Sequence, residues 1–136
     1  MSAQPRRALT GVPAHAWAAC ACSEGAERSV IVLLASNLGA AETFAEETAQ
    51  LLTLLNGAQP VARTLTEADA AVPAFEADCD LLGVLTLLRH GNHDAKRPLL
   101  IACTPGSLTR RSPAPEATAK AEIVVRKGEK LALRDF

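Results

Sequence analysis

The sequence predicts an α/β domain built on an open parallel sheet. Residues 30–34 form a continuous apolar run rich in β-branched side chains, which is typical of a strand covered on both faces. A segment with apolar side chains at helical spacing follows, and further apolar runs come after it. Strands that alternate with helices indicate an open α/β sheet, and the connections between its parallel strands are expected to be right-handed.

The helix expected after the first strand covers residues 41–56. Small or apolar side chains recur there at helical spacing from Ala41 to Leu55, and glutamates near the start suit the helix dipole. Gly57 predicts the end of this helix, because glycine accepts the left-handed conformation of a helix cap.

Three further strands are expected in the rest of the core. Residues 61–65 alternate as a second strand, residues 66–72 predict a short helical turn, and residues 81–86 read as a buried third strand. Residues 98–103 are expected to form a fourth strand. Only about ten residues separate the third strand from the fourth, which is short for a parallel crossover through a helix.

The two ends of the chain have a different composition from the core. Residues 1–28 contain Pro, Gly, Ser and Ala without apolar periodicity and are interpreted as a flexible leader or linker. Residues 29–103 form the expected α/β core. Residues 104–136 are interpreted as a linker followed by a C-terminal β-hairpin, with strands at 123–126 and 130–133.

Composition and charge exclude several classes of protein. The net charge is -1, and the core is acidic while the last third of the chain is basic, so nucleic acid is not expected as the main partner. No run approaches the length of a membrane helix. The four cysteines do not form CxxC pairs and are expected to be buried, reduced thiols of a cytoplasmic protein, with a metal site or redox pair at Cys20 and Cys22 as the alternative.

The turn between the first strand and its helix is the strongest candidate for a binding site. Backbone N–H groups at a helix start have no partner within the helix, and the positive end of the helix dipole faces the same way. Ser36 offers a hydroxyl, and Gly39 allows a phosphate to approach the backbone closely. The turn therefore predicts an anion site, with a plain capped connector as the alternative.

The turn carries the pattern Ser-x-x-Gly-x-Ala-Glu from Ser36 to Glu42, between a strand and a helix. This segment resembles the opening of the FMN domains in cytochrome P450 reductases and in bacterial P450:NADPH reductase fusions. The resemblance covers residues 29–96, about half of the chain. It implies a flavodoxin-like open parallel sheet, incomplete in this chain, and FMN as the cofactor.

The resemblance also implies which residues hold the flavin. The FMN phosphate would be cradled by Ser36, Asn37, Leu38, Gly39 and Ala40. The loop beside the isoalloxazine ring would begin with Thr86, Leu87, Leu88, Arg89, His90, Gly91 and Asn92. Such a domain takes electrons from a separate reductase domain and passes them to a haem or another redox acceptor protein, and it needs no acid or base side chain.

Two departures from the family pattern keep a second reading open. Ala40 stands where the family often has a hydroxyl residue, and residues 87–92 supply no aromatic ring for the flavin. The alternative is a non-catalytic α/β interaction module, or a gene fragment, that binds no flavin.

A third reading comes from the string Gly91-Asn92-His93-Asp94, which also occurs in calcineurin-like metallophosphatases. A two-metal hydrolase needs ligands from several loops to hold both ions and to orient water. No Asp-x-His lies near the first strand, so a metal-dependent phosphoesterase is the least favoured of the three hypotheses.

Overall fold

Three parallel strands form the sheet of this protein, which is described over residues 8–68, 73–109 and 116 of a computed structural model. The elements follow in this order: η1 (Ala14–Ala16), α1 (Trp17–Gly25), β1 (Val30–Leu34), α2 (Leu38–Asn56), β2 (Val61–Thr64), α3 (Ala74–His90), β3 (Leu99–Cys103) and α4 (Pro105–Leu108). The protein is therefore an α/β protein with an open, parallel sheet, as the sequence predicts.

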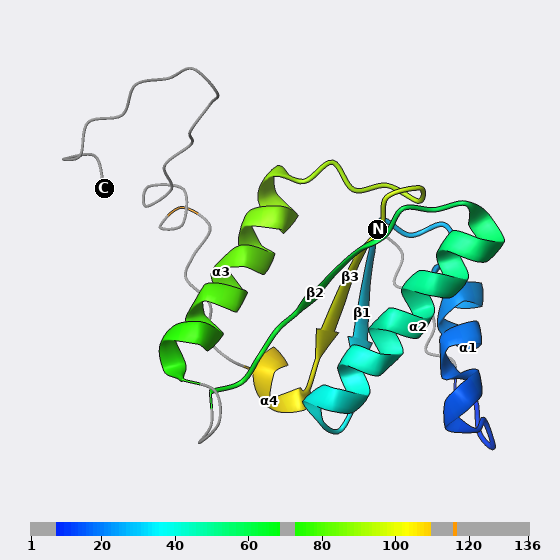
Figure 1. The fold of residues 1–136 in the computed structure, drawn as a ribbon, viewed down its shortest axis with the longest axis horizontal. Coiled ribbons are helices and arrows are strands. Elements are labelled where there is room, and N and C mark those ends of the chain that lie inside the picture. Colours follow the sequence, from blue (N-terminus) through cyan, green and yellow to red (C-terminus); the bar gives the residue numbers. More distant parts are fainter. Residues whose placement is uncertain (1–7, 69–72, 110–115, 117–136) are drawn as a thin grey trace.

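The last strand lies in the middle of the sheet, in the order β1-β3-β2. Val30 pairs with Leu99 at one end of the β1–β3 ladder, and Leu34 pairs with Cys103 at the other. The arrowheads of β1 and β3 in Figure 1 point toward the end where α2 and α4 begin. The carboxyl ends of the strands and the starts of two helices therefore share one edge of the molecule.

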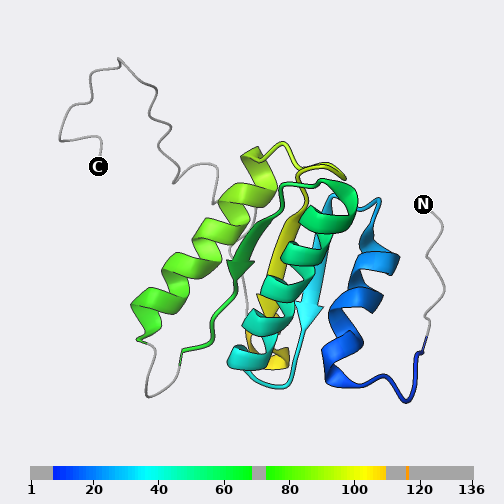
Figure 2. The same ribbon diagram turned by 45° about the vertical axis from the view of Figure 1, so that its right-hand side comes forward.

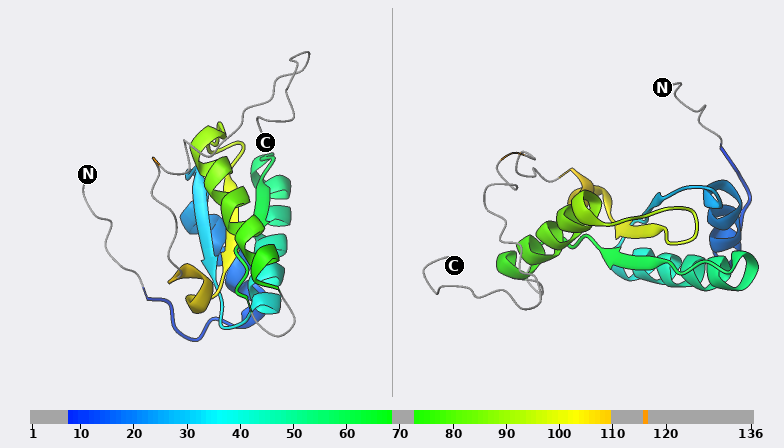
Figure 3. Two further views of the ribbon diagram at one scale, coloured as in Figure 1. Left: turned by 90° about the vertical axis from the view of Figure 1, so that its left-hand side faces the viewer. Right: turned by 90° about the horizontal axis from the view of Figure 1, so that it is seen from above.

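Helices cover both faces of the central strand. Leu100 packs with Cys22 and Leu52, so α1 and α2 lie on one face of β3, while Leu99 and Ile101 pack with side chains of α3 on the other. Figures 1 and 2 show α3 alongside β2, with α1 and α2 together at the opposite side of the sheet. The left view of Figure 3 shows α2 running along one face of the sheet.

Because helices cover both faces of β3, every residue of this strand is buried. An all-apolar run such as Leu-Leu-Ile-Ala-Cys suits a strand with helices on both faces, because neither face meets water. The strand also joins separate apolar clusters on its two faces. β3 is thus the centre of the core.

The first strand is covered on one face only. Ile31 and Leu33 pack toward α1 and α2, whereas Val30, Val32 and Leu34 on the opposite face are between 37% and 49% exposed. Their neighbours on β3 lie under α3, which does not extend over β1. β1 therefore presents an open apolar face at the edge of the described sheet.

The prediction of a third strand at residues 81–86 is wrong, because these residues lie within α3. Ala77, Leu81 and Val84 are its buried positions, at the spacing of one helix face. Glu76 in the first turn and Arg89 in the last suit the helix dipole. α3 is the crossover helix between β2 and β3, which form a regular parallel pair. The connection of about ten residues, which is short for a crossover, therefore does not join two strands.

The interpretation of residues 1–28 as a leader without regular structure is also wrong over part of its length. Residues 14–25 form η1 and α1, in which Ala18 is buried and Cys22 packs with Leu52 of α2. The structure confirms the strand predicted at residues 30–34, the helix predicted at 41–56, which is α2, and the strands predicted near residues 61 and 99. Gly57 caps α2 with a φ of 64°. The expected hairpin at 123–133 lies outside the described residues.

Candidate functional site

The turn after β1 lies at the carboxyl edge of the sheet, where ligands of open α/β proteins bind. Ser36 and Asn37 are exposed in the turn, and Leu38, Gly39 and Ala40 form the first turn of α2. All five residues assigned to the phosphate are therefore together, at the amino end of a helix of 19 residues.

The hydrogen bonds of this turn decide which groups remain for a ligand. Asn37 is the cap of α2: its side-chain Oδ1 accepts the N–H of Ala40 at 2.8 Å, and its carbonyl accepts the N–H of Ala41 at 3.0 Å. The helix start leaves the N–H groups of residues 37–40 without a helical partner, and since only that of Ala40 is bound by Asn37 Oδ1, those of Leu38 and Gly39 are among the three that stay available. Asn37 shapes the turn, and Leu38 and Gly39 supply the donors.

A cavity of about 460 Å³ lies between this turn and the turn that follows β3. Thr104 and Ser107 lock the second turn by a capping box, in which the Thr104 N–H donates to Ser107 Oγ at 2.9 Å. Glu67 reaches into the same cavity, where its Oε2 lies 3.5 Å from Thr104 Oγ1 and its carboxylate lies against Gly106. This side of the phosphate turn therefore carries a negative charge.

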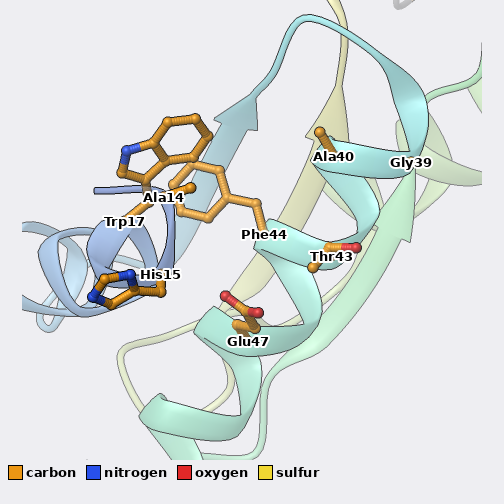
Figure 4. Close-up of a pocket in the computed structure, with 8 residues that line it drawn as sticks. All are labelled: Ala14, His15, Trp17, Gly39, Ala40, Thr43, Phe44 and Glu47. Atoms are coloured by element: carbon orange, nitrogen blue, oxygen red, sulfur yellow. The ribbon is translucent and has the colours of Figure 1, made fainter. Parts of the chain in front are cut away.

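A second hollow lies on the other side of the turn, between α2 and the segment that leads into α1 (Figure 4). Its volume is about 400 Å³. We call it the aromatic groove, and it is lined by Ala14, His15, Trp17, Gly39, Ala40, Thr43, Phe44 and Glu47. The first turn of α2 thus separates an acidic cavity from a groove with two aromatic rings.

The residues assigned to the flavin ring are not near the phosphate turn. Thr86, Leu87, Leu88, Arg89 and His90 belong to the last turns of α3, Gly91 is its cap, and Asn92 follows. The loop beyond them leads into the amino end of β3, where the Lys96 carbonyl accepts the N–H of Gln59, two residues before β2. Residues 86–90 are therefore helical rather than part of a ring-binding loop, and the end of α3 lies at the opposite edge of the sheet (Figure 1).

The Gly-Asn-His-Asp string forms a tight loop at that opposite edge. Asp94 Oδ1 accepts the N–H groups of Lys96 and Arg97, each at 2.9 Å, and these two bonds are the main reason that the pKa of Asp94 is lowered. His93 Nδ1 lies 3.4 Å from the carbonyl of Arg97. Within residues 8–68 and 73–109, no three His, Cys, Asp or Glu side chains come together as a metal site would require.

The four cysteines are free thiols in different surroundings. Cys22 and Cys103 are buried, and burial raises the pKa of both thiols. Cys20 is half-buried and Cys79 is exposed on α3, so the expectation that Cys79 is buried is wrong. Its place on a helix rather than before a strand is the reason.

These surroundings predict a clear order of thiol reactivity. Cys79 is expected to react first with a small disulfide reagent at pH 8, because the thiolate is the reactive form and Cys79 is accessible. Cys22 and Cys103 are expected to react only as fast as the protein unfolds. Peptide mapping after timed labelling checks this order, and early labelling of Cys103 would contradict the buried position of β3.

Sequence reasoning missed the residues that come to the phosphate turn from distant segments. Trp17 belongs to the segment interpreted as a leader, and Thr104 to one interpreted as a linker. One signal was present in each case: Trp17 is the only Trp in the chain, and Thr104-Pro-Gly-Ser begins with a residue that favours helix caps.

Comparison of the chain with protein-family models, curated proteins and solved structures finds no match to any of them. Among the helices in the described part of the chain, none has the length and apolar character needed to cross a membrane.

Proposed function

We propose that this protein is an FMN-binding electron-transfer module with a flavodoxin-like sheet. The single observation that supports the proposal best is the turn after β1, where the N–H groups of Leu38 and Gly39 lie at the start of α2, at the carboxyl edge of the sheet, and the Asn37 side chain binds the N–H of Ala40 instead. Two adjacent N–H groups at the positive end of a helix are suited to a phosphate.

The space around Gly39 fits a phosphate that approaches the backbone. A Cβ added at Gly39 would meet only Asn37 Oδ1, at 3.6 Å, so nothing in the protein itself requires glycine there. Its φ is also not positive. The close approach of a ligand would explain why position 39 carries no side chain, while the exposed Ser36 lines the neighbouring cavity that carries Glu67.

The order of the strands bears on the likeness to flavodoxins. In the flavodoxin order, 2-1-3-4-5, the first strand lies between the second and the third, whereas β3 lies in the middle here. The strand beside β1 is the one expected fourth in the chain, so the described sheet shares with flavodoxins a parallel neighbour for β1 but not the strand order.

Bound FMN would supply the redox chemistry, and this chain would hold and orient it. The proposed donor is a separate reductase domain and the proposed acceptor is a haem or similar redox protein. The acidic excess of the core would favour docking on a basic surface and would mainly affect the rate of encounter and the orientation.

The test is reconstitution of the purified full-length protein with FMN. After removal of free flavin, we expect a yellow protein that releases one FMN per chain on denaturation. A protein that stays colourless after incubation with excess FMN would contradict the proposal.

The open face of β1 favours a second candidate function, an interaction module that binds no flavin. Val30, Val32 and Leu34 expose an apolar surface beside an unpaired strand edge of the described sheet. Such an edge is suited to pairing with another strand. A colourless protein that elutes as a stable complex with a second copy or another chain would support this alternative.

A further inference from the structure

The aromatic groove is open to solvent and has the size of a small-ligand site. Its volume of about 400 Å³ lies within the range usual for ligand cavities. One wall comes from η1 and the start of α1, and the other from the first turns of α2. Figure 4 shows the two aromatic rings together at one end of the groove, with His15 and Glu47 farther along it.

Trp17 provides a fixed, partly uncovered aromatic surface in this groove. Its ring centroid lies 6.1 Å from that of Phe44 with the planes at 50°, and its Nε1–H donates to the carbonyl of Val12 at 3.2 Å. Phe44 is itself held against the core beside Leu33. Although the indole is oriented by these two contacts, it is still 43% exposed.

The groove begins at the phosphate turn. Gly39 and Ala40 line one end of it, and Glu47 lies eight residues farther along α2, which is about 12 Å of helix. The cavity on the other side of the turn carries the carboxylate of Glu67, which repels an anion. The groove has a carboxylate of its own, that of Glu47, but this lies about 12 Å of helix away from Gly39. A ligand whose anionic end is at Gly39 and whose flat aromatic body extends toward Trp17 is therefore better accommodated on the side of the groove.

We propose that the aromatic groove holds the isoalloxazine ring of the flavin, stacked on Trp17, with Glu47 accepting a hydrogen bond from the imide N–H of the ring. This inference rests on the proposed function, because it assigns the ring of the same ligand. The ring is thereby assigned to the aromatic groove next to the phosphate turn and not to residues 86–92, which lie at the opposite edge of the sheet.

The experiment compares FMN with riboflavin, which has the same ring but no phosphate. Both affinities are measured on the full-length protein from the change in flavin fluorescence. Trp17→Ala is expected to weaken both ligands by about 10-fold to 100-fold, the loss seen when an aromatic stacking partner is removed. Trp17→Phe is expected to restore most of that loss.

Glu47→Gln is the second variant, and it leaves the aromatic packing between the helices unchanged. It is expected to weaken both flavins several-fold, whereas Glu46→Gln, exposed on α2 outside the groove, is the matched control and is expected to bind like the unmodified protein. Circular dichroism of each variant confirms that α1 and α2 are still folded.

The outcomes separate this inference from the proposed function. If the unmodified protein binds FMN and neither Trp17→Ala nor Glu47→Gln changes the affinity, the ring lies elsewhere and the inference is overturned while the proposed function stands. If the unmodified protein binds neither flavin, both are overturned. Parallel losses of FMN and riboflavin in Trp17→Ala, with rescue by Trp17→Phe, would support the ring site.

Discussion

Gly39→Asp is expected to reduce FMN affinity by about 100-fold or more while the fold remains intact. Two unit charges 4 Å apart near a protein surface repel each other by about 4 kcal/mol, and solvent screening removes part of this. The new carboxylate also competes for the N–H groups that would hold the phosphate. Flavin fluorescence titration measures the loss.

The same substitution is expected to leave stability unchanged or slightly higher. A Cβ at Gly39 meets no close neighbour, and an acidic side chain in the first turn of a helix stabilises it by about 0.3–1 kcal/mol. Lower affinity together with equal or higher stability cannot come from misfolding. Gly39→Asp that binds FMN normally would show that the phosphate lies elsewhere.

Two control variants separate charge from crowding. Gly83→Asp adds the same charge in α3, where a Cβ meets nothing within 4 Å, and is expected to bind FMN normally. Gly39→Ala adds bulk without charge and is expected to have a smaller effect than Gly39→Asp. Riboflavin, which lacks the phosphate, is expected to bind Gly39→Asp almost as well as the unmodified protein.

Leu100→Ala is expected to lower the free energy of unfolding by about 2–5 kcal/mol, the usual cost of truncating a buried leucine. Leu100 is fully buried in the central strand and packs with Cys22 of α1 and Leu52 of α2. Its removal leaves a cavity where three elements meet. Since small domains are stable by only about 5–15 kcal/mol, the shift in a urea unfolding curve should be large.

Leu54→Ala is the matched control for this measurement. Leu54 belongs to the same helix as Leu52 but is 80% exposed, so its truncation is expected to change stability by less than about 0.5 kcal/mol. Equal effects of Leu100→Ala and Leu54→Ala would contradict the packing of α1 and α2 on β3.

The first βα unit could be predicted from the sequence because its signals are local. The apolar run of β1, the spacing within α2 and the position of Gly57 all lie within about thirty residues and agree with one another. The phosphate turn is part of this local unit, which is why its five residues are found together.

The segment around residues 81–86 was misread because an apolar run does not by itself distinguish a strand from a buried helix. Two signals favoured the helix. The apolar pattern extends from Phe75 to Leu88, longer than a usual strand, and the ten residues before the next strand are too few for a second crossover.

The remaining part of the candidate site depends on contacts between distant segments. Trp17 reaches the phosphate turn only because α1 packs on α2, and Thr104 reaches it only because β3 pairs with β1. Neither pairing can be deduced from the pattern of either segment alone. The α1–α2 contact was further concealed because the segment carrying Trp17 has Pro and Ala without apolar periodicity.

The central claim, that the turn after β1 binds the phosphate of FMN, is tested most directly by the backbone amide resonances of the ¹⁵N-labelled protein. Addition of FMN is expected to cause its largest shifts at the N–H groups of Leu38 and Gly39, and riboflavin is expected to shift the resonance of Leu38, which does not line the aromatic groove, much less than FMN does. Shifts that are absent, or that gather at residues 86–92 instead, would contradict the account.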